Sequence, residues 1–178
     1  MRQTDKKQFG ARTVSLEADI AQLKIQEKEL QFSSFSEEDA WKLGHAMRSA
    51  AIAKNHPFVI DIRVAGRKLF FSALPGSVPE NENWVRRKIN IVMVKHKSSY
   101  HIGRELAQNG KVLDEAQGFN PIDVAPHGGC FPIIIKNVGV VGTVTVSGIP
   151  QREDHNFVVE QLCAYLKLDH ATIKLAAE

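Results

Sequence analysis

The sequence predicts a single α+β domain, in which one antiparallel β-sheet made of two hairpins is flanked by α-helices. Two stretches, 57–74 and 131–147, alternate in side-chain character with a period of two, and each contains a short turn. Four other stretches carry apolar residues at helical spacing: 15–32, 36–56, 84–109 and 150–166. Hairpins join antiparallel strands, because parallel neighbours need long crossovers. The order α-α-β-β-α-α-β-β-α therefore predicts one sheet covered by helices.

The composition is that of a globular domain. The 178 residues are 43% hydrophobic and 24% charged, and no apolar run approaches the ~20 residues of a membrane helix. The net charge of +3 comes from interleaved acids and bases, a pattern that does not favour nucleic acid. We expect residues 1–14 to be a flexible basic N-terminus and residues 15–178 to form the single domain.

The chain shows no sign of export. Its first residues, MRQTDKKQFG, are charged and lack the apolar core of a secretory signal. Cys130 and Cys163 form no metal or redox spacing with each other. We therefore expect a cytoplasmic protein with reduced thiols, and neither a membrane nor a nucleic acid as a partner.

The helix over 36–56 has a defined start. Ser36 is followed three residues later by Asp39, which approximates a capping box in which Asp replaces the usual Glu or Gln. Leu43 and Met47 then recur at helical spacing and give the helix one apolar face.

The first hairpin is predicted from PFVIDIRV, the turn AG and RKLFFSAL, where Phe58 and Ile60 face one way and Val59 and Asp61 the other. The next segment, SALPGSVPENEN, contains two prolines and a glycine and is predicted to be a loop. A helical pattern then runs from Trp84 to about Asn109, with a break expected near KSS at 97–99. The segment QGFNPIDVAPHGG is irregular.

The second hairpin is predicted to pair residues 131–135 with residues 140–147 around the turn NVG. Pro150 suits the first turn of a closing helix. The apolar stripe of that helix contains Val158 and Leu162.

The two ends of the second hairpin carry the first candidate site. His127, Gly128 and Gly129 precede one strand, and Ser147 ends the other. Antiparallel pairing brings these ends together, and the closing helix then adds its own first turn. The alternative is structural: two glycines permit a sharp turn into the strand, and the histidine caps a loop carbonyl.

Asp154 and His155 lie in the first turn of the closing helix. The helix dipole by itself explains an acid there. His155 shares the buried stripe with Val158 and Leu162, so it is either a core histidine or part of a pocket at the end of the sheet. An Asp–His pair can orient an imidazole as a general base, with His127 or His155 in that role.

Metal binding and covalent catalysis are not indicated by these residues. Two histidines and an aspartate are suitable ligands, but they lack ligand spacing, and Asp154 and His155 point in different directions on a helix. No nucleophile motif accompanies them, and Cys130 opens an apolar strand, where a cysteine is usually buried. We therefore predict no metal and favour binding over catalysis.

A basic stretch is the second candidate site. Between residues 83 and 104 there are six cations and no acid: Arg86, Arg87, Lys88, Lys95, Lys97 and Arg104. In a helix Arg87, Lys88 and Lys95 can share a face and favour an anionic ligand, such as a carboxylate, a phosphate or the propionates of a haem. The alternative is an ordinary solvated face of the helix.

Three motifs together resemble the haem-degrading-domain family, and within it an uncharacterised cytosolic branch. They are HGG-x-FPI at 127–133, VSGIPQREDH at 146–155 and NWVRRK at 83–88. The resemblance implies a profilin-like fold, a ring-like homo-oligomer, and haem or another tetrapyrrole as the ligand to consider. It also brings Ser98 and Ser99 into the candidate site, because some relatives have a histidine before this pair. Here Lys97 stands at that position and His96 precedes it, a shift of about 100° on a helix.

Three hypotheses follow. The first is a domain that binds a small anionic ligand, such as a tetrapyrrole, in a pocket between subunits, through the basic helix and the end of the second hairpin that carries His127 and His155. The second is an enzyme that uses His127 or His155 as a general base. The third is an oligomeric adaptor that binds another protein and in which the apparent site is structural.

Overall fold

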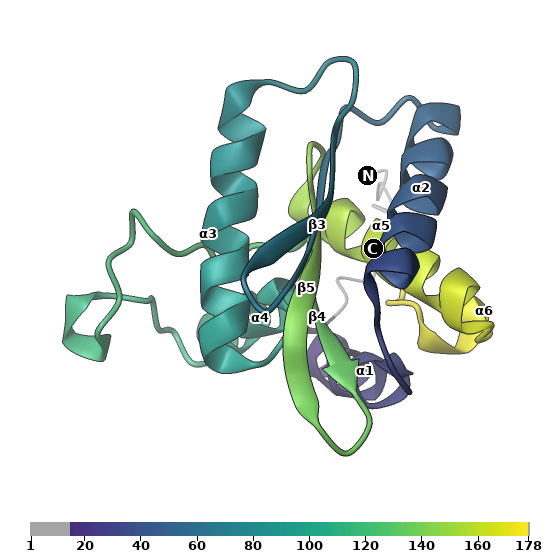
Figure 1. Ribbon diagram of the computed structural model, residues 1–178. Helices are drawn as coiled ribbons and strands as arrows, with labels where there is room; N and C mark the ends of the chain where they lie inside the picture. Colours follow the sequence, from purple (N-terminus) through teal and green to yellow (C-terminus); the bar gives the residue numbers. More distant parts are fainter. Residues whose placement is uncertain (1–14, 178) are drawn as a thin grey trace, which may run out of the picture.

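A computed structural model of the protein describes residues 15–177 (Figure 1). The predicted flexible segment 1–14 lies outside the described residues. The strands are β1 (Gln31–Phe32), β2 (Val59–Val64), β3 (Arg67–Ala73), β4 (Cys130–Ile135) and β5 (Gly139–Ser147). The helices are α1 (Leu16–Glu29), α2 (Glu37–Ala53), α3 (Pro79–Lys95), α4 (Ser99–Gln108), α5 (Gln151–Leu166) and α6 (His170–Ile173), with a 3₁₀ turn at Glu115–Gln117.

The five strands form one sheet in the order β1-β4-β5-β2-β3. Both predicted hairpins are present, and they join through antiparallel pairing of β2 with β5, in which Val59 lies opposite Ser147. The sheet is not wholly antiparallel as predicted, because β1 pairs in parallel with β4. A strand of two residues is too short to show a period of two, so no pattern in the sequence predicts it.

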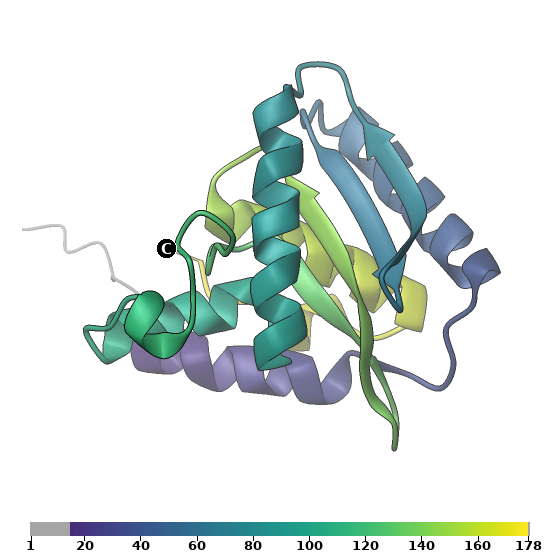
Figure 2. The same ribbon diagram turned by 60° about the vertical axis from the view of Figure 1, so that its left-hand side comes forward.

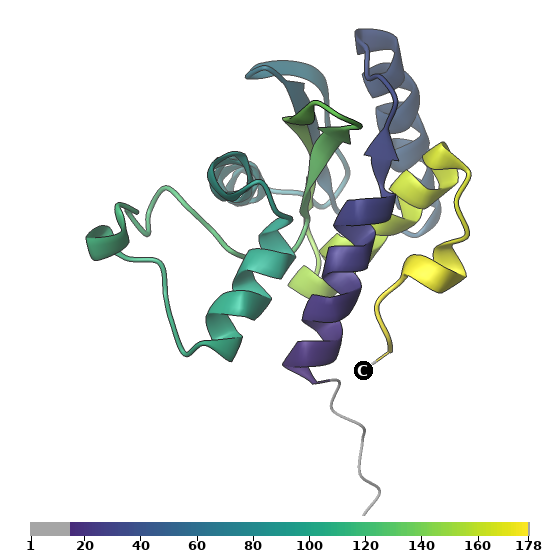
Figure 3. The same ribbon diagram turned by 90° about the horizontal axis from the view of Figure 1, so that it is seen from below.

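Helices cover both faces of the sheet. Helices α2 and α5 pack on one face and α3 crosses the other, while α1 lies beside α4 (Figures 1–3). The segment between α4 and β4 projects away from the sheet, to the left in Figure 1. The predicted α+β class is confirmed.

The main core lies between the sheet and the α2–α5 layer, where Ile60, Phe131 and Val146 meet Met47 and Leu162. A second apolar cluster lies under α3, and its members include Val59, Val85, Ile89, Val92 and Cys130. Because α3 covers the second face, a charged residue of β2 is also buried there. Asp61 has no exposed surface, and its carboxylate is paired with Arg63 at 2.8 Å.

Local signals in the sequence set several helix ends. The capping box at the start of α2 is confirmed, since the backbone N–H of Ser36 donates to Asp39 and that of Asp39 donates back to the Ser36 hydroxyl. The predicted break lies between α3 and α4, where His96 has a positive φ. Helix α3 begins at Pro79, earlier than expected, because proline fits the first helical turn.

Among the helices between residues 15 and 177, none has both the length and the apolar character needed to cross a bilayer.

Candidate functional site

The HGG motif is where the chain passes tightly between α3 and α5 before β4. Gly129 has φ +118°, a region that favours glycine, and a Cβ there would lie 2.7 Å from Nζ of Lys88. A Cβ on Gly128 would collide with the backbone carbonyl of Gln151. Both glycines are therefore needed for this close packing, as the structural alternative proposed.

A buried ion pair lies directly behind the motif. Nζ of Lys88 is 2.7 Å from Oδ2 of Asp154 and also donates to the carbonyl of Val146 at 3.1 Å. The other carboxylate oxygen of Asp154 accepts the backbone N–H of Ile149. Burial raises the pKa of Asp154, although Lys88 acts in the opposite direction. The pair ties α3 and α5 to the end of β5.

His155 lies away from this pair, in the core. Its Nε2 is 2.8 Å from Oε1 of Gln26, and its ring stacks on that of Tyr100. Burial, reinforced by Arg152 and His101, lowers the pKa of His155 to about 3, so the ring is neutral. It lines neither of the two pockets described below.

The expected orienting contact between Asp154 and a histidine is not made among the described residues. Adjacent positions on a helix diverge by about 100°, so Asp154 faces Lys88 while His155 faces Gln26. The carboxylate of Asp154 accepts hydrogen bonds from Lys88 and from the backbone N–H of Ile149, and it has no hydrogen bond to His127. Burial also raises the pKa of the Cys130 thiol to about 12, which removes it as a nucleophile.

His127 stands at the surface end of the motif. Its ring meets that of Trp84 edge-on, with the ring centroids 5.3 Å apart, and the guanidinium of Arg87 lies over the Trp84 ring, 4.6 Å from its centroid. Partial burial, together with Lys88 and Arg87, keeps the pKa of His127 below its ordinary value. This shift favours the neutral ring, in which one nitrogen keeps a lone pair for a ligand and the other carries the proton.

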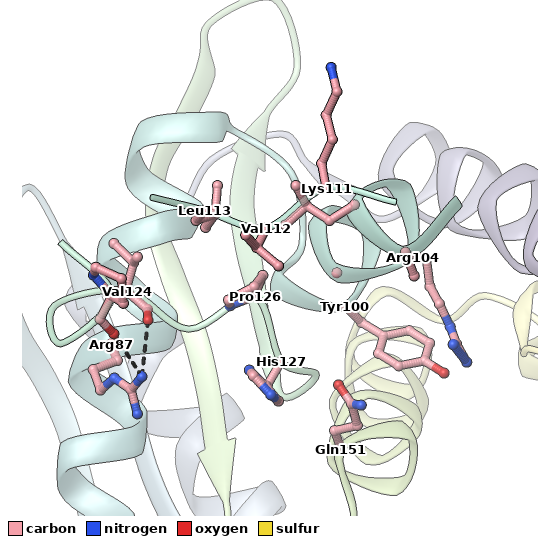
Figure 4. A pocket seen from close by; sticks show the side chains of 14 residues that line it. Arg87, Tyr100, Arg104, Lys111, Val112, Leu113, Val124, Pro126, His127 and Gln151 are labelled. Atoms are coloured by element: carbon pink, nitrogen blue, oxygen red, sulfur yellow. Dashed lines mark hydrogen bonds between the residues drawn. The ribbon is translucent and has the colours of Figure 1, made fainter. Parts of the chain in front are cut away.

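The large pocket, of about 420 Å³, lies between α3, α4 and the segment 111–127 (Figure 4). Arg87, Tyr100, Arg104 and His127 line it together with apolar side chains, which include Leu106, Val112, Leu113, Val124 and Pro126. None of the described residues that line it carries a carboxylate. Its wall is therefore apolar and cationic.

The cations of the large pocket are held in different ways. Nη2 of Arg87 donates to the carbonyls of Pro121 and Val124 at 2.9 and 3.3 Å, which fixes its guanidinium at the wall (Figure 4). Nε of Arg104 lies 3.1 Å from the buried carboxylate of Asp19. Lys111 extends outward from the rim (Figure 4).

A small pocket of about 260 Å³ lies on the other side of His127. Its wall includes the Lys88–Asp154 pair and Ser147, so this end of the second hairpin does surround a cavity. Asn81, Trp84 and Gln151 complete most of its lining. His127 and Gln151 line both pockets.

The predicted basic face is wrong for Lys88. Its side chain is only 4% exposed and points toward the sheet, so it does not share a solvent face with Arg87. Arg86 is bound to Asp123 at 3.0 Å, and Lys97 to Glu105 at 2.7 Å. Because these cations have local acidic partners, the basic run does not form one anion-binding surface.

Ser98 and Ser99 have structural roles. The Ser98 hydroxyl accepts the N–H of His101 and caps α4, while the Ser99 hydroxyl bonds the backbone of Cys130. Both serines are fully buried, and neither of them lines a pocket. Arg86 is exposed and also lines neither pocket. Of the residues predicted for the two candidate sites, Arg87, Arg104 and His127 line the large pocket, and Lys88, His127, Ser147 and Asp154 line the small one.

Sequence reasoning missed Tyr100, Asn81, Gln151 and the whole wall from the segment 111–126. Gln151 lies in the VSGIPQREDH motif, which could have indicated it, whereas the segment 111–126 has no periodic pattern from which a structure could be predicted. Within residues 15–177, no three His, Cys, Asp or Glu side chains are grouped so that they could hold a metal ion.

Comparison with known proteins assigns the family. A sequence model described as "Haem degrading protein HbpS-like" matches residues 35–163. The chain belongs to this HbpS-like family. The resemblance predicted from the three motifs is thereby confirmed. Helix α1 and the chain beyond residue 163 lie outside the matched region, and α1 supplies Asp19 and Gln26 to the interior described above.

This HbpS-like protein is similar to the UPF0303 protein of Acidobacterium capsulatum, with 52% identity over 162 residues, 91% of this chain and 98% of the relative. The crystal structure of the Ybr137w protein matches with a TM-score of 0.75 and 30% identity, over 88% of this chain and 90% of that one. The crystal structure of a PduOC:Heme complex matches with a TM-score of 0.62 over 77% of this chain and 98% of that one. Its identity is 17%, so it supports the fold alone.

Proposed function

We propose that this HbpS-like protein binds a small anionic ligand with an apolar body in the large pocket, and that haem or another tetrapyrrole is the first ligand to test. The observation that carries the proposal is the wall of this pocket. Arg87 and Arg104 stand among apolar side chains, and none of the described lining residues carries a carboxylate. Such a wall attracts an anion and removes apolar surface from water.

The arrangement of Arg87 supports recognition of carboxylates. Two loop carbonyls hold its guanidinium through one nitrogen, which leaves further N–H groups for a ligand. An arginine fixed in advance loses less side-chain entropy when a ligand binds.

The residues present fit haem. The arginines suit its propionates, the apolar wall suits the macrocycle, and the neutral ring of His127 is an axial ligand that iron accepts. The likeness of the fold to a protein crystallised as a haem complex agrees with this choice. When bound, haem would supply redox or sensing chemistry, and the chain would supply the position, the charge and the neutral histidine.

We also propose that the protein acts in the cytoplasm as a homo-oligomer, as the family resemblance implies. In such an assembly a neighbouring subunit would cover the rim of the large pocket, where Lys111 stands. Native mass spectrometry tests the assembly, and a strictly monomeric mass would contradict it.

Haem titration followed by absorbance tests the ligand. The wild type should shift the Soret band at micromolar haem, Arg87→Ala should weaken binding, and His127→Ala should change the position of the band. Arg86→Ala is the matched control, because Arg86 precedes Arg87 but binds Asp123 at the surface. A wild type without a Soret shift would exclude a tetrapyrrole. Equal effects of the two arginine variants would exclude the large pocket.

A further inference from the structure

The small pocket has a different chemistry from the large one. At its floor the positive charge of Lys88 is balanced by Asp154 at 2.7 Å, and both side chains are almost fully buried. An ammonium has three N–H donors. Two of them are used, by Asp154 and by the carbonyl of Val146. The third has no partner among the described residues.

Two carboxamides also line this pocket, and backbone contacts fix which way each one points. Oδ1 of Asn81 accepts the N–H of Val78 at 2.8 Å, and Oε1 of Gln151 accepts the N–H of Gly128 at 3.3 Å. Only an amide oxygen can accept a hydrogen bond, so the NH₂ group of each side chain is left as the free end. Neither NH₂ group has a partner within residues 15–177.

Free donors outnumber free acceptors in the same place. The carboxylate of Asp154 already accepts from Lys88 and from the backbone N–H of Ile149, and the other side-chain acceptors in the lining are the ring of His127 and the hydroxyl of Ser147. The polar groups of the small pocket that still lack a hydrogen-bond partner are therefore mainly N–H donors, which an oxygen acceptor on a ligand would satisfy. The Lys88–Asp154 pair contributes no net charge, and its carboxylate disfavours an anion nearby.

We propose that the small pocket is a second binding site, which takes the carbonyl oxygen of an uncharged ligand group such as a carboxamide, a ketone or an aldehyde. The donors are Lys88, Asn81 and Gln151. This site adjoins the large pocket at His127 and Gln151. It does not depend on the large pocket, because the large pocket favours an anionic ligand and the small pocket an uncharged one.

Benzamide and benzoate test this proposal, because they share a shape and differ in charge. In ¹⁵N-labelled full-length protein, benzamide should shift the indole signal of Trp84 and the amide of Gly148, both at the small pocket. The indole of Trp41, on α2, is the internal control. Benzoate should instead shift the amide of Gly103 at the large pocket. Benzamide that leaves Trp84 and Gly148 unchanged overturns the proposal.

Two variants test the donors themselves. Gln151→Glu and Asn81→Asp each keep the oxygen that accepts a backbone N–H but lose the NH₂ group, so each should weaken benzamide binding at least tenfold. Gln161→Glu makes the same charge change further along α5 and should leave binding unchanged. Benzamide affinity that survives in both pocket variants, or falls equally in Gln161→Glu, overturns the proposal.

The two proposals fail separately. Absence of benzoate shifts at Gly103 together with absence of haem binding would count against the large pocket. Absence of benzamide shifts at Gly148 counts against the small pocket alone.

Discussion

Nζ of Lys88 lies 2.7 Å from Oδ2 of Asp154, and the two side chains are 4% and 2% exposed. The pair joins α3 to α5 behind the HGG motif, at the floor of the small pocket. A cation in the middle of a helix is thus part of the interior, and the surrounding backbone depends on it.

Asp154→Asn should destabilise the fold by about 3 kcal/mol, because it keeps the acceptor for Ile149 but leaves the charge of Lys88 buried without a counter-charge. Urea denaturation measures the change. The double variant Lys88→Met/Asp154→Asn removes that charge, so it should recover a substantial part of the loss. Additive single and double effects would show that the two residues are not coupled.

His155 should make the protein sensitive to acid. Its pKa is about 3 in the folded protein and 6.5 in the unfolded chain. Between these values the unfolded chain binds more protons, so stability that is present above pH 6.5 is lost as the pH falls toward 3. The loss is on the order of 4 kcal/mol.

Urea denaturation at a series of pH values checks this. His155→Gln should be less stable than the wild type at pH 7 but should show a shallower loss between pH 6.5 and 3. His45→Gln, at an exposed position on α2, should keep the wild-type slope. Identical slopes in all three proteins would contradict the role of His155.

Asp19 connects α1 to the wall of the large pocket. Its buried carboxylate contacts Arg104 at 3.1 Å and Arg152 at 2.7 Å. Asp19→Ala should cost about 2–3 kcal/mol, less than for a fully buried pair because both guanidinium groups are partly exposed. It should also weaken haem binding, since Arg104 loses the carboxylate that holds its guanidinium in place.

Glu38→Ala is the control: it removes an exposed ion pair with Lys42 and should change neither the stability nor haem binding. A stable Asp19→Ala protein with normal binding would contradict this.

Gly129→Ala should destabilise the fold by at least about 2 kcal/mol, because it combines a strained positive φ with collisions at the backbone carbonyl of Val146 and at Nζ of Lys88. Gly66→Ala is the matched control. Gly66 also has a positive φ, of +76°, but a Cβ there meets nothing within 4 Å, so only the backbone strain remains. Thermal unfolding compares the two, and equal losses would mean that the close contacts of Gly129 with Val146 and Lys88 are unimportant.

The elements that were predicted well are those whose signals are local. The Ser36–Asp39 capping box, the alternation around Ile60 and the break after Lys95 each depend on residues close in sequence. Antiparallel pairing then followed from the short turns, and it placed His127 and Ser147 at one cavity. These features need no knowledge of distant contacts.

The direction of individual side chains was not predictable in the same way. The basic run at 83–104 predicts a face that Lys88 shares with Arg87, either as an anion site or as a solvated surface, because charged residues on helices are usually exposed. Its partner Asp154 is 66 residues away, and no local pattern indicates the pair. The same holds for the contact of His155 with Gln26 across 129 residues.

The sequence by itself determined the α+β class, the two hairpins, the family and the neighbourhood of the HGG motif. Tertiary structure decided which of the candidate residues reach a cavity and which serve the interior. The physical reason is that periodicity and capping act within a few residues, whereas burial of a charge or a histidine depends on partners from distant segments. The HGG motif belongs to both levels: its glycines are required by packing, and its histidine stands between two pockets of different chemistry.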